Sequence, residues 1–312
     1  MSKKLKLSVS PHIHSGRSTS RIMLDVIIAL LPATVAGTII FGLRSLLVVA
    51  VTVASAVLFE LLFNLIVKKD QTISDLSAVV TGLLLALNLP ANVPIWQCVV
   101  GALFAIVVVK CLFGGLGSNV VNPAITARVF MLIAFGSMAK SAFPEGVELE
   151  GAATPLASLA KGETVELMDV LLGKTGGTIG ETCAIALLIG FVYLLVRRVI
   201  TWQLPVTMVG VVFVFSFFME GFDVVKALTL VLSGGLLLGA IFMATDYVTS
   251  PATAWGKVIF GLGAGLITCI IRYFGAYPEG VSFAILFMNI LTPYIDSWTR
   301  HKVFGTEEVA KA

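Results

Sequence analysis

The stretch from residue 46 to residue 67, LLVVAVTVASAVLFELLFNLIV, holds one ionisable side chain, Glu60, in 22 residues. A helix needs roughly 20 predominantly apolar residues to cross the hydrocarbon core of a bilayer. Apolar and polar residues do not alternate along the stretch, as they would in a strand of a membrane barrel. It therefore predicts a membrane-spanning helix and an all-α fold.

The rest of the chain repeats this pattern. Hydrophobic residues make up 58% of the 312 residues and charged residues only 12%, and the mean hydropathy is +1.01. These values exclude a water-soluble globular domain. Since backbone groups in hydrocarbon must be hydrogen-bonded within their own segment, we expect a polytopic protein of about ten transmembrane helices. The candidate runs are 22–42, 46–67, 74–90, 95–113, 123–139, 180–196, 202–219, 226–243, 256–272 and 281–298.

The distribution of positive charge predicts the orientation. Residues 1–21 are too hydrophilic for a cleaved signal peptide and are expected to stay in the cytoplasm. With that tail inside, fourteen of the 21 lysines and arginines fall on the cytoplasmic side and six outside, as the positive-inside rule requires. Both tails, 1–21 and 299–312, are then cytoplasmic, and loop 140–179 is extracytoplasmic.

The order of the runs predicts an internal repeat. Five runs precede loop 140–179 and five follow it, and an odd number per half inverts the second half relative to the first. We therefore expect two inverted five-helix repeats, 22–139 and 180–298. Of two similar tetrapeptides, Val-Asn-Pro-Ala at 121–124 opens the fifth run and Thr-Ser-Pro-Ala at 249–252 stands before the ninth. Their prolines suit the first turn of a helix.

Helix breaks of this kind suggest a ligand site. Irregular backbone at membrane depth is tolerated where it lines a polar cavity, and paired breaks in two halves point to a binding site. The alternative is that both tetrapeptides are caps and turns at the membrane interface. The candidate ligand-binding residues are Asn122, Thr245, Asp246, Thr249 and Ser250.

The segment EGAATPLA at 150–157 presents one threonine, Thr154, among small residues in the predicted outer loop. Its hydroxyl is sterically open to a transferase that would attach a phosphate ester. The motif is short and common, so an ordinary loop threonine is the alternative. The following residues, 155–172, are apolar enough to form one or two short helices.

Five ionisable residues lie in or beside the apolar runs: Asp25, Glu60, Lys110, Arg128 and Asp246. Such groups are expensive in a membrane and are often functional. We expect Asp25 to favour the N-terminal dipole of its helix and Lys110 to reach the cytoplasmic surface. Glu60 and Asp246 are candidate sodium ligands, because carboxylates suit hard cations; the alternative is intramembrane pairing, for example with Arg128.

The four cysteines, Cys98, Cys111, Cys183 and Cys269, show no C-x-x-C spacing. Each lies in or beside an apolar run, where cysteine is commonly a small packing residue. The alternative is that one of them contributes a metal or cluster ligand at an interface with another subunit.

Four motifs carry a resemblance to a known family: FMATDYVTSP at 242–251, GGLGSNVVNPA at 114–124, SPHIH at 10–14 and AATPL at 152–156. Together they closely resemble the D subunits of Rnf electron-transport complexes (RnfD). They also resemble, less closely, the B subunits of sodium-pumping NADH:quinone oxidoreductases. The similarity covers essentially the whole chain.

The resemblance implies a urea-transporter-like arrangement of the two repeats and two flavins. Proteins of this family carry FMN joined through a phosphoester bond to a threonine, and Thr154 matches that position. A second, noncovalent flavin, riboflavin, is implied within the bundle, and we place it at the helix breaks. The transferase pattern has Asp six residues, Ser or Thr three residues and Gly two residues before the threonine, whereas this chain has Glu148, Gly151 and Ala152.

The resemblance also implies a function and partners. The chain would relay electrons between ferredoxin and NAD, coupled to Na⁺ or H⁺ translocation, in a bacterial or archaeal inner membrane. Its partners would be the A, B, C, E and G subunits of the Rnf complex and a flavin transferase, with no nucleic acid. Because the chain lacks a dinucleotide fingerprint and a cluster motif, it would not be catalytic alone. The alternatives are a solute channel or secondary transporter of inverted-repeat fold, and a passive scaffold.

Overall fold

The computed structural model describes residues 18–136, 142–143, 154–160, 165–275 and 280–300. In these ranges the chain is helical, and the one β-interaction is an isolated bridge between Ala142 and Gly177. The predicted all-α class is confirmed.

Each apolar run contains a helix or a broken pair of helices. The first half forms α1 (Thr19–Phe41), α2 (Leu43–Val67), the short 3-10 helix η1 (Ile73–Asp75), α3 (Ser77–Leu87), α4 (Ile95–Leu103), the π-helix η2 (Phe104–Cys111) and α5 (Pro123–Ala134). The second half, with its preceding loop, forms α6 (Pro155–Ala160), α7 (Leu167–Leu172), α8 (Ala184–Val196), α9 (Gln203–Met219), α10 (Val224–Leu232), α11 (Leu236–Leu238), the π-helix η4 (Gly239–Met243), α12 (Ala254–Phe274) and α13 (Val281–Thr299).

In the described ranges three helices, α1, α2 and α12, are long and apolar enough to cross a membrane. A fourth span results if α10 and α11–η4, bent by 63° at their junction, are counted together. Others are shorter: α3 has 11 residues and, at 1.5 Å per residue, extends only about 17 Å. Apolar side chains continue past such helices into irregular backbone, which a hydropathy window does not distinguish from helix. The count of ten spans and the inverted relation of the halves stay predictions.

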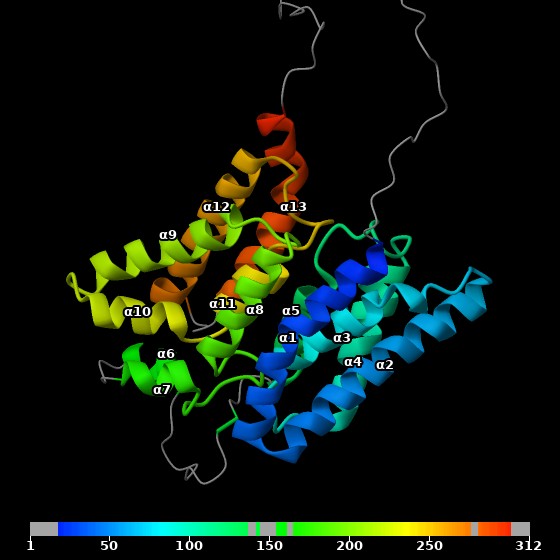
Figure 1. The fold of residues 1–312 in the computed structure, drawn as a ribbon, viewed down its shortest axis with the longest axis horizontal. Helices are drawn as coiled ribbons and strands as arrows, with labels where there is room; N and C mark the ends of the chain where they lie inside the picture. Colours follow the sequence, from blue (N-terminus) through cyan, green and yellow to red (C-terminus); the bar gives the residue numbers. More distant parts are fainter. Residues whose placement is uncertain (1–17, 137–141, 144–153, 161–164, 276–279, 301–312) are drawn as a thin grey trace, which may run out of the picture.

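The two halves of the chain lie side by side and meet along two helix pairs. Figure 1 shows α1 to α5 grouped on one side and α9 to α13 on the other. Helix α1 packs against α8, and α5 packs against α13. Side chains from both halves therefore meet at the centre of the molecule.

Close packing of α2 and α3 positions the start of α3. At Gly82, a Cβ atom would lie 2.9 Å from the Cα of Val53 and 3.0 Å from the Cβ of Ala56, so glycine is what allows the two helices to approach. At the first residue of α3, the backbone N–H of Ser77 donates to the Asp75 carboxylate at 2.7 Å. This brings the Ser77 side chain towards the end of α2.

The second half begins with irregular backbone rather than with helix. The N–H of Ile179 donates to Leu89 O at 3.1 Å, and the N–H of Gly180 donates to Leu87 O at 2.8 Å. These bonds satisfy carbonyl groups at and just beyond the end of α3, which its own helix leaves without partners. Helix α8 therefore begins at Ala184, four residues after the predicted start.

The cysteines are placed as packing residues. Cys98, Cys111 and Cys269 are buried and Cys183 is half-buried, all as free thiols. Within the part of the chain that the structure describes, no group of three or more His, Cys, Asp or Glu side chains could hold a metal ion.

Candidate functional site

The two predicted helix breaks meet in space through Asn122. Its side-chain oxygen caps α5 by accepting from the N–H groups of Ala124 at 3.0 Å and Ile125 at 3.2 Å. Its amide nitrogen donates to the carbonyl oxygen of Met243, the last residue of η4, at 3.2 Å. One side chain therefore both starts a helix of the first half and ties it to the break in the second.

Two residues of α13 complete this junction. The hydroxyl of Thr292 donates to Thr249 O at 2.8 Å. With its amide oriented to satisfy both neighbours, Asn289 donates to Thr249 O at 3.2 Å and accepts from the N–H of Asn122 at 3.1 Å. Sequence reasoning missed both residues, although a buried Asn and Thr three positions apart on an apolar helix was an available signal.

The predicted residues after η4 divide between two surroundings. Thr245 and Asp246 line a cavity beside Asn122, whereas Ser250 lines a smaller neighbouring pocket with Lys257. The hydroxyl of Thr249 donates to Asp246 Oδ2 at 3.2 Å.

The cavity beside Asn122 lies where α1, α3, η2, α5 and η4 converge. It has a volume of about 90 Å³, room for a few water molecules and less than the roughly 300–1,000 Å³ of small-molecule and cofactor sites. Its apolar walls include Leu84, Leu194 and Phe242. Its polar lining consists of Ser77, Thr81, Lys110, Asn119, Asn122, Thr245, Asp246 and Tyr247. Hereafter it is called the central cavity.

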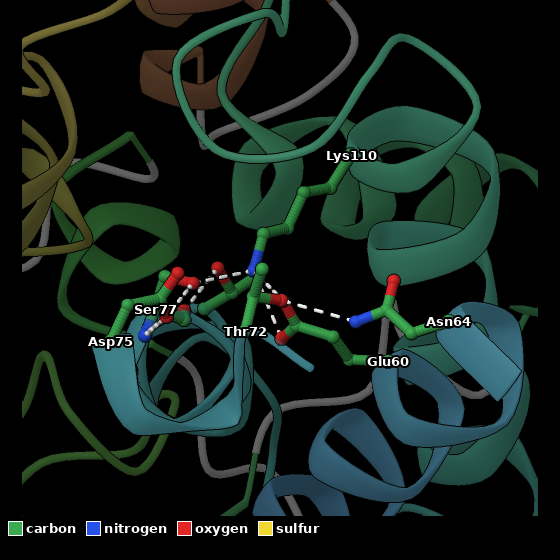
Figure 2. Close-up of polar contacts among 7 residues, drawn as sticks. Glu60, Asn64, Thr72, Asp75, Ser77 and Lys110 are labelled. Atoms are coloured by element: carbon green, nitrogen blue, oxygen red, sulfur yellow. Dashed lines mark hydrogen bonds and ion pairs between the residues drawn. The ribbon is translucent and has the colours of Figure 1, made fainter. Parts of the chain in front are cut away.

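Lys110, which lines the central cavity, forms a buried ion pair with Glu60 (Figure 2). The Nζ atom of Lys110 lies 3.0 Å from each carboxylate oxygen of Glu60, and both residues are 2% exposed. The expectation that Lys110 reaches the cytoplasmic surface is therefore wrong. The pairing alternative for Glu60 is what the structure shows, but with Lys110 in place of Arg128. A cation at Glu60 would have to displace this ammonium group.

Hydrogen bonds extend the ion pair in two directions (Figure 2). On one side Thr72 donates to Glu60 Oε1 at 2.7 Å and accepts from Asn64 Nδ2 at 3.1 Å. On the other side Lys110 Nζ lies 2.6 Å from Ser77 Oγ, and that hydroxyl donates to Asp75 Oδ1 at 2.5 Å. Three helical elements besides η2 thus contribute to one polar network.

The π-helix η2 explains why Lys110 points inward. Its end is closed by i→i−5 hydrogen bonds from Leu112 N to Val107 O and from Gly115 N to Lys110 O, both 3.0 Å. A π-helical turn holds more residues than an α-helical turn, so it shifts the faces that later side chains occupy, and such turns are frequent at functional sites. Helical periodicity of 3.6 residues does not predict this placement.

The structure also places the two other ionisable residues of the apolar runs, Asp25 and Arg128. The Asp25 carboxylate accepts from the Tyr193 hydroxyl at 3.0 Å and from Arg197 Nε at 3.2 Å, between α1 and α8. Because α1 begins at Thr19 and has no acidic residue in its first turn, the expected dipole role of Asp25 is wrong. Arg128 is buried and lines a smaller pocket with Asn88.

Thr154 lies at the start of α6, on the other side of the molecule. It is half-buried, and its Oγ1 accepts from the N–H of Ala157 at 3.3 Å. The helices α6 and α7 confirm the two short helices predicted in 155–172. The transferase-pattern positions Glu148, Gly151 and Ala152 lie outside the described residues.

Helix α6 rests on the bend between α10 and α11. Gly234 lies in that bend with φ +69, and a Cβ atom there would be 2.6 Å from Leu156 Cδ1. The Arg272 guanidinium donates to Leu230 O at 2.7 Å and to Ser233 O at 3.2 Å, which satisfies carbonyl groups at the end of α10. The bend therefore supports the segment that carries Thr154.

Comparisons with known proteins give one family over the full length. Residues 6–305 match the model of the NQR2, RnfD, RnfE family. The D subunit of the Na⁺-translocating ferredoxin:NAD⁺ oxidoreductase complex of Acetobacterium woodii is 45% identical, over 98% of this chain and 97% of that protein. The proton-translocating counterpart of Clostridium ljungdahlii is 38% identical, over 96% of each chain. The D subunit of the ion-translocating oxidoreductase complex of Actinobacillus succinogenes is 34% identical, over 96% of this chain and 98% of that protein.

Proposed function

We propose, because the chain belongs to the NQR2, RnfD, RnfE family, that it is the flavin-carrying membrane subunit of a ferredoxin:NAD oxidoreductase complex. In this role it relays electrons while the complex translocates Na⁺ or H⁺. The observation that carries the proposal is similarity over nearly the entire length of proteins named as D subunits of such complexes. Their names specify sodium in one case and protons in the other, so either ion fits this chain.

The surroundings of Thr154 fit a covalent FMN. Its oxygen accepts a hydrogen bond from Ala157 N, so the hydroxyl proton is not used in that bond and can be replaced by phosphorus. A transferase with its own metal would activate the phosphoryl group, and no base beside Thr154 is then required. The attached flavin would supply one- and two-electron transfer, while the protein positions the ring and shields it from water.

The lining of the central cavity has the composition expected for the second flavin, riboflavin, although its walls would have to move apart to admit the ring. Its apolar walls suit the faces of a flat ring, and amide and hydroxyl groups such as those of Asn119, Asn122 and Thr245 suit the polar edge. A mainly apolar pocket with a few convergent polar groups is the usual form of a cofactor site.

The two proposed sites lie towards opposite ends of α12. Thr154 is supported near Arg272, close to the C-terminal end of α12, whereas the central cavity includes Tyr247 and Val248, shortly before its N-terminal end. Helix α12 has 21 residues and extends about 31 Å at 1.5 Å per residue. Two redox groups at these positions would be separated by most of the thickness of the helix bundle.

The test is detection of covalent flavin. The chain is produced together with its flavin transferase, denatured, separated by electrophoresis and viewed under ultraviolet light. We expect fluorescence from the wild type and from Ser158→Ala, which removes a hydroxyl one turn along α6, but none from Thr154→Val. Mass spectrometry of the Thr154 peptide, and extraction of noncovalent flavin from the native protein, complete the test. A wild type without any flavin would favour the solute-transporter alternative.

A further inference from the structure

An apolar groove lies between α8 and α9, and we propose that it binds one acyl chain of an anionic membrane phospholipid. Residues of α10, α11 and η4 complete its lining. Hereafter it is called the α8–α9 groove. It shares no lining residue with the central cavity, so its occupant does not depend on the proposed flavins.

The α8–α9 groove has a buried floor and exposed rims. Leu237 of α11 and Ile241 of η4 form the floor and are 4% and 2% exposed. Leu188 of α8 and Val206 of α9 form the rims and are 40% and 49% exposed. Helix α9 packs against α10 and α12, whereas α8 packs against α1, so the two walls belong to different packing layers. The groove is therefore open towards the lipid side of the helix bundle.

Gly210 leaves space in the wall that α9 contributes. A Cβ atom on Gly210 would meet no atom within 4 Å, and Gly210 lines the groove. Glycine weakens the interior of a helix relative to alanine. Unlike Gly82, Gly210 is not explained by the close approach of another helix of this chain. The space at Gly210 is thus available to a group from outside the chain.

The size and chemistry of the groove exclude polypeptide as its occupant. Its volume is about 380 Å³, whereas one turn of a helix, about 5.4 Å long and 10–12 Å across, takes up roughly 420–610 Å³. None of the eleven described residues that line it has a polar side chain. An extended peptide in the groove would leave N–H and C=O groups unpaired, which is costly in a membrane. A hydrocarbon chain is slimmer and has no such groups.

Packing explains why an acyl chain would prefer the groove to the surrounding bilayer. Lipid tails are as apolar as leucine, so entering the groove brings no hydrophobic gain. The walls of an empty groove, however, lack partners for dispersion contacts. A chain between Phe191 of α8 and Phe213 of α9 would contact both walls and the floor, whereas a chain beside a single helix contacts one surface.

The end of the groove at the start of α9 suits a negatively charged headgroup. Trp202 is 58% exposed, and its carbonyl oxygen accepts from the N–H of Val206 at 3.1 Å, so it stands one turn from the rim. Tryptophan concentrates at the headgroup level of membranes. The connection from α8 also holds two exposed arginines, Arg197 and Arg198. Asp25 pairs with Arg197, so these three residues keep one net positive charge, which attracts anionic lipid.

The experiment is photo-crosslinking of lipid to the intact complex. The complex is reconstituted in phosphatidylcholine bilayers that contain a small fraction of phosphatidylglycerol with a diazirine in one acyl chain. On irradiation the diazirine loses N₂, and the carbene that remains inserts into a nearby C–H bond. Mass spectrometry of the peptides of this chain then locates the label. We expect it on the groove-lining residues of α8 and α9.

Variants of α9 test whether the groove itself holds the chain. Gly210→Phe fills the groove and should decrease labelling there by about tenfold, the scale of an overpacked contact. Gly210→Ala adds only a methyl group, and Val214→Phe adds the same ring one turn along α9, at a side chain that is 52% exposed and outside the groove lining. Both controls should label like the wild type. Val206→Phe fills the groove from its exposed rim and provides the same test if Gly210→Phe does not assemble.

Unlabelled lipids identify the source of the chain. Phosphatidylglycerol should compete with the labelled lipid about fivefold better than phosphatidylcholine, the scale of one positive charge near the membrane surface. Equal competition by phosphatidylcholine, or stronger competition by an isoprenoid quinone, would overturn the assignment to an anionic phospholipid. Equal labelling of Gly210→Phe and Val214→Phe would overturn the groove as the binding site. Label on Val214 but not in the groove of the wild type would also overturn it, because a partner subunit would then cover the groove.

Discussion

The central cavity and the Thr154 segment are built in opposite ways. Beside the cavity, the charged groups of Glu60 and Lys110 are deeply buried and each is held by several hydrogen bonds. The Thr154 hydroxyl is half-buried, lies on a six-residue helix and makes one capping bond. The first region resists rearrangement because an unpaired buried charge is costly. The second holds no buried charge among its described residues and is only half-buried at Thr154.

The difference matches what each region would have to do in the proposed function. A threonine that another enzyme modifies has to be reachable, and a short helix resting on one bend meets that need. A site that binds a ring benefits from groups held in fixed positions. Variants that break the buried ion pair, or that disturb the bend supporting Thr154, test this comparison.

The largest effect is expected from breaking the buried ion pair. Lys110→Met leaves the Glu60 carboxylate without its partner, and loss of one member of a buried pair costs about 3–5 kcal/mol. The double variant Lys110→Met/Glu60→Met removes both charges and should recover most of that loss. The measurement is the free energy of unfolding of each purified variant in detergent. If Lys110→Met unfolds with the same free energy as the wild type, the buried pair does not make the cavity region resistant to rearrangement.

A smaller effect is expected at the bend that supports Thr154. Gly234→Ala adds a Cβ atom 2.6 Å from Leu156 Cδ1, so α6 has to shift. Gly221→Ala is the matched control, because Gly221 has nearly the same φ, +68, with no atom within 4 Å. Both variants carry the left-handed backbone penalty of about 1–2 kcal/mol, and Gly234→Ala adds an overpacking cost of about 1–3 kcal/mol.

The same two variants test whether the bend between α10 and α11 affects the attachment of flavin to Thr154. We expect Gly234→Ala to decrease the covalent flavin fluorescence of the chain and to accelerate limited proteolysis around α6, while Gly221→Ala leaves both unchanged. Identical behaviour of the two variants would mean that the contact between Leu156 and Gly234 does not position the segment.

The smallest effect is expected between α1 and α8. Tyr193→Phe removes the hydroxyl that donates to Asp25 at 3.0 Å, and a hydrogen bond to a charged group contributes about 1.5–3 kcal/mol. Arg197 still contacts the carboxylate in this variant. The midpoint of thermal unfolding in detergent measures the change, and noncovalent flavin content should stay at the wild-type level. Loss of the flavin would show that this interface shapes the central cavity.

Sequence reasoning reached part of the candidate site. The tetrapeptides at 121–124 and 249–252 identified the two breaks, and the structure brings Asn122, Thr245 and Asp246 to one cavity. It did not identify Asn289, Thr292 or the chain from Asp75 to Lys110. Those contacts join residues far apart in the chain, and their register depends on π-helical turns that a 3.6-residue period does not describe.

By itself, the sequence determined that this is an all-α membrane protein. This follows from a local property, because backbone groups in hydrocarbon must be paired within their own helix. Tertiary structure alone decided which charges pair, where the cavity lies and what supports Thr154. Those outcomes depend on how closely helices approach, as at Gly82 and Gly234, and on which atoms then come within hydrogen-bonding distance of each other.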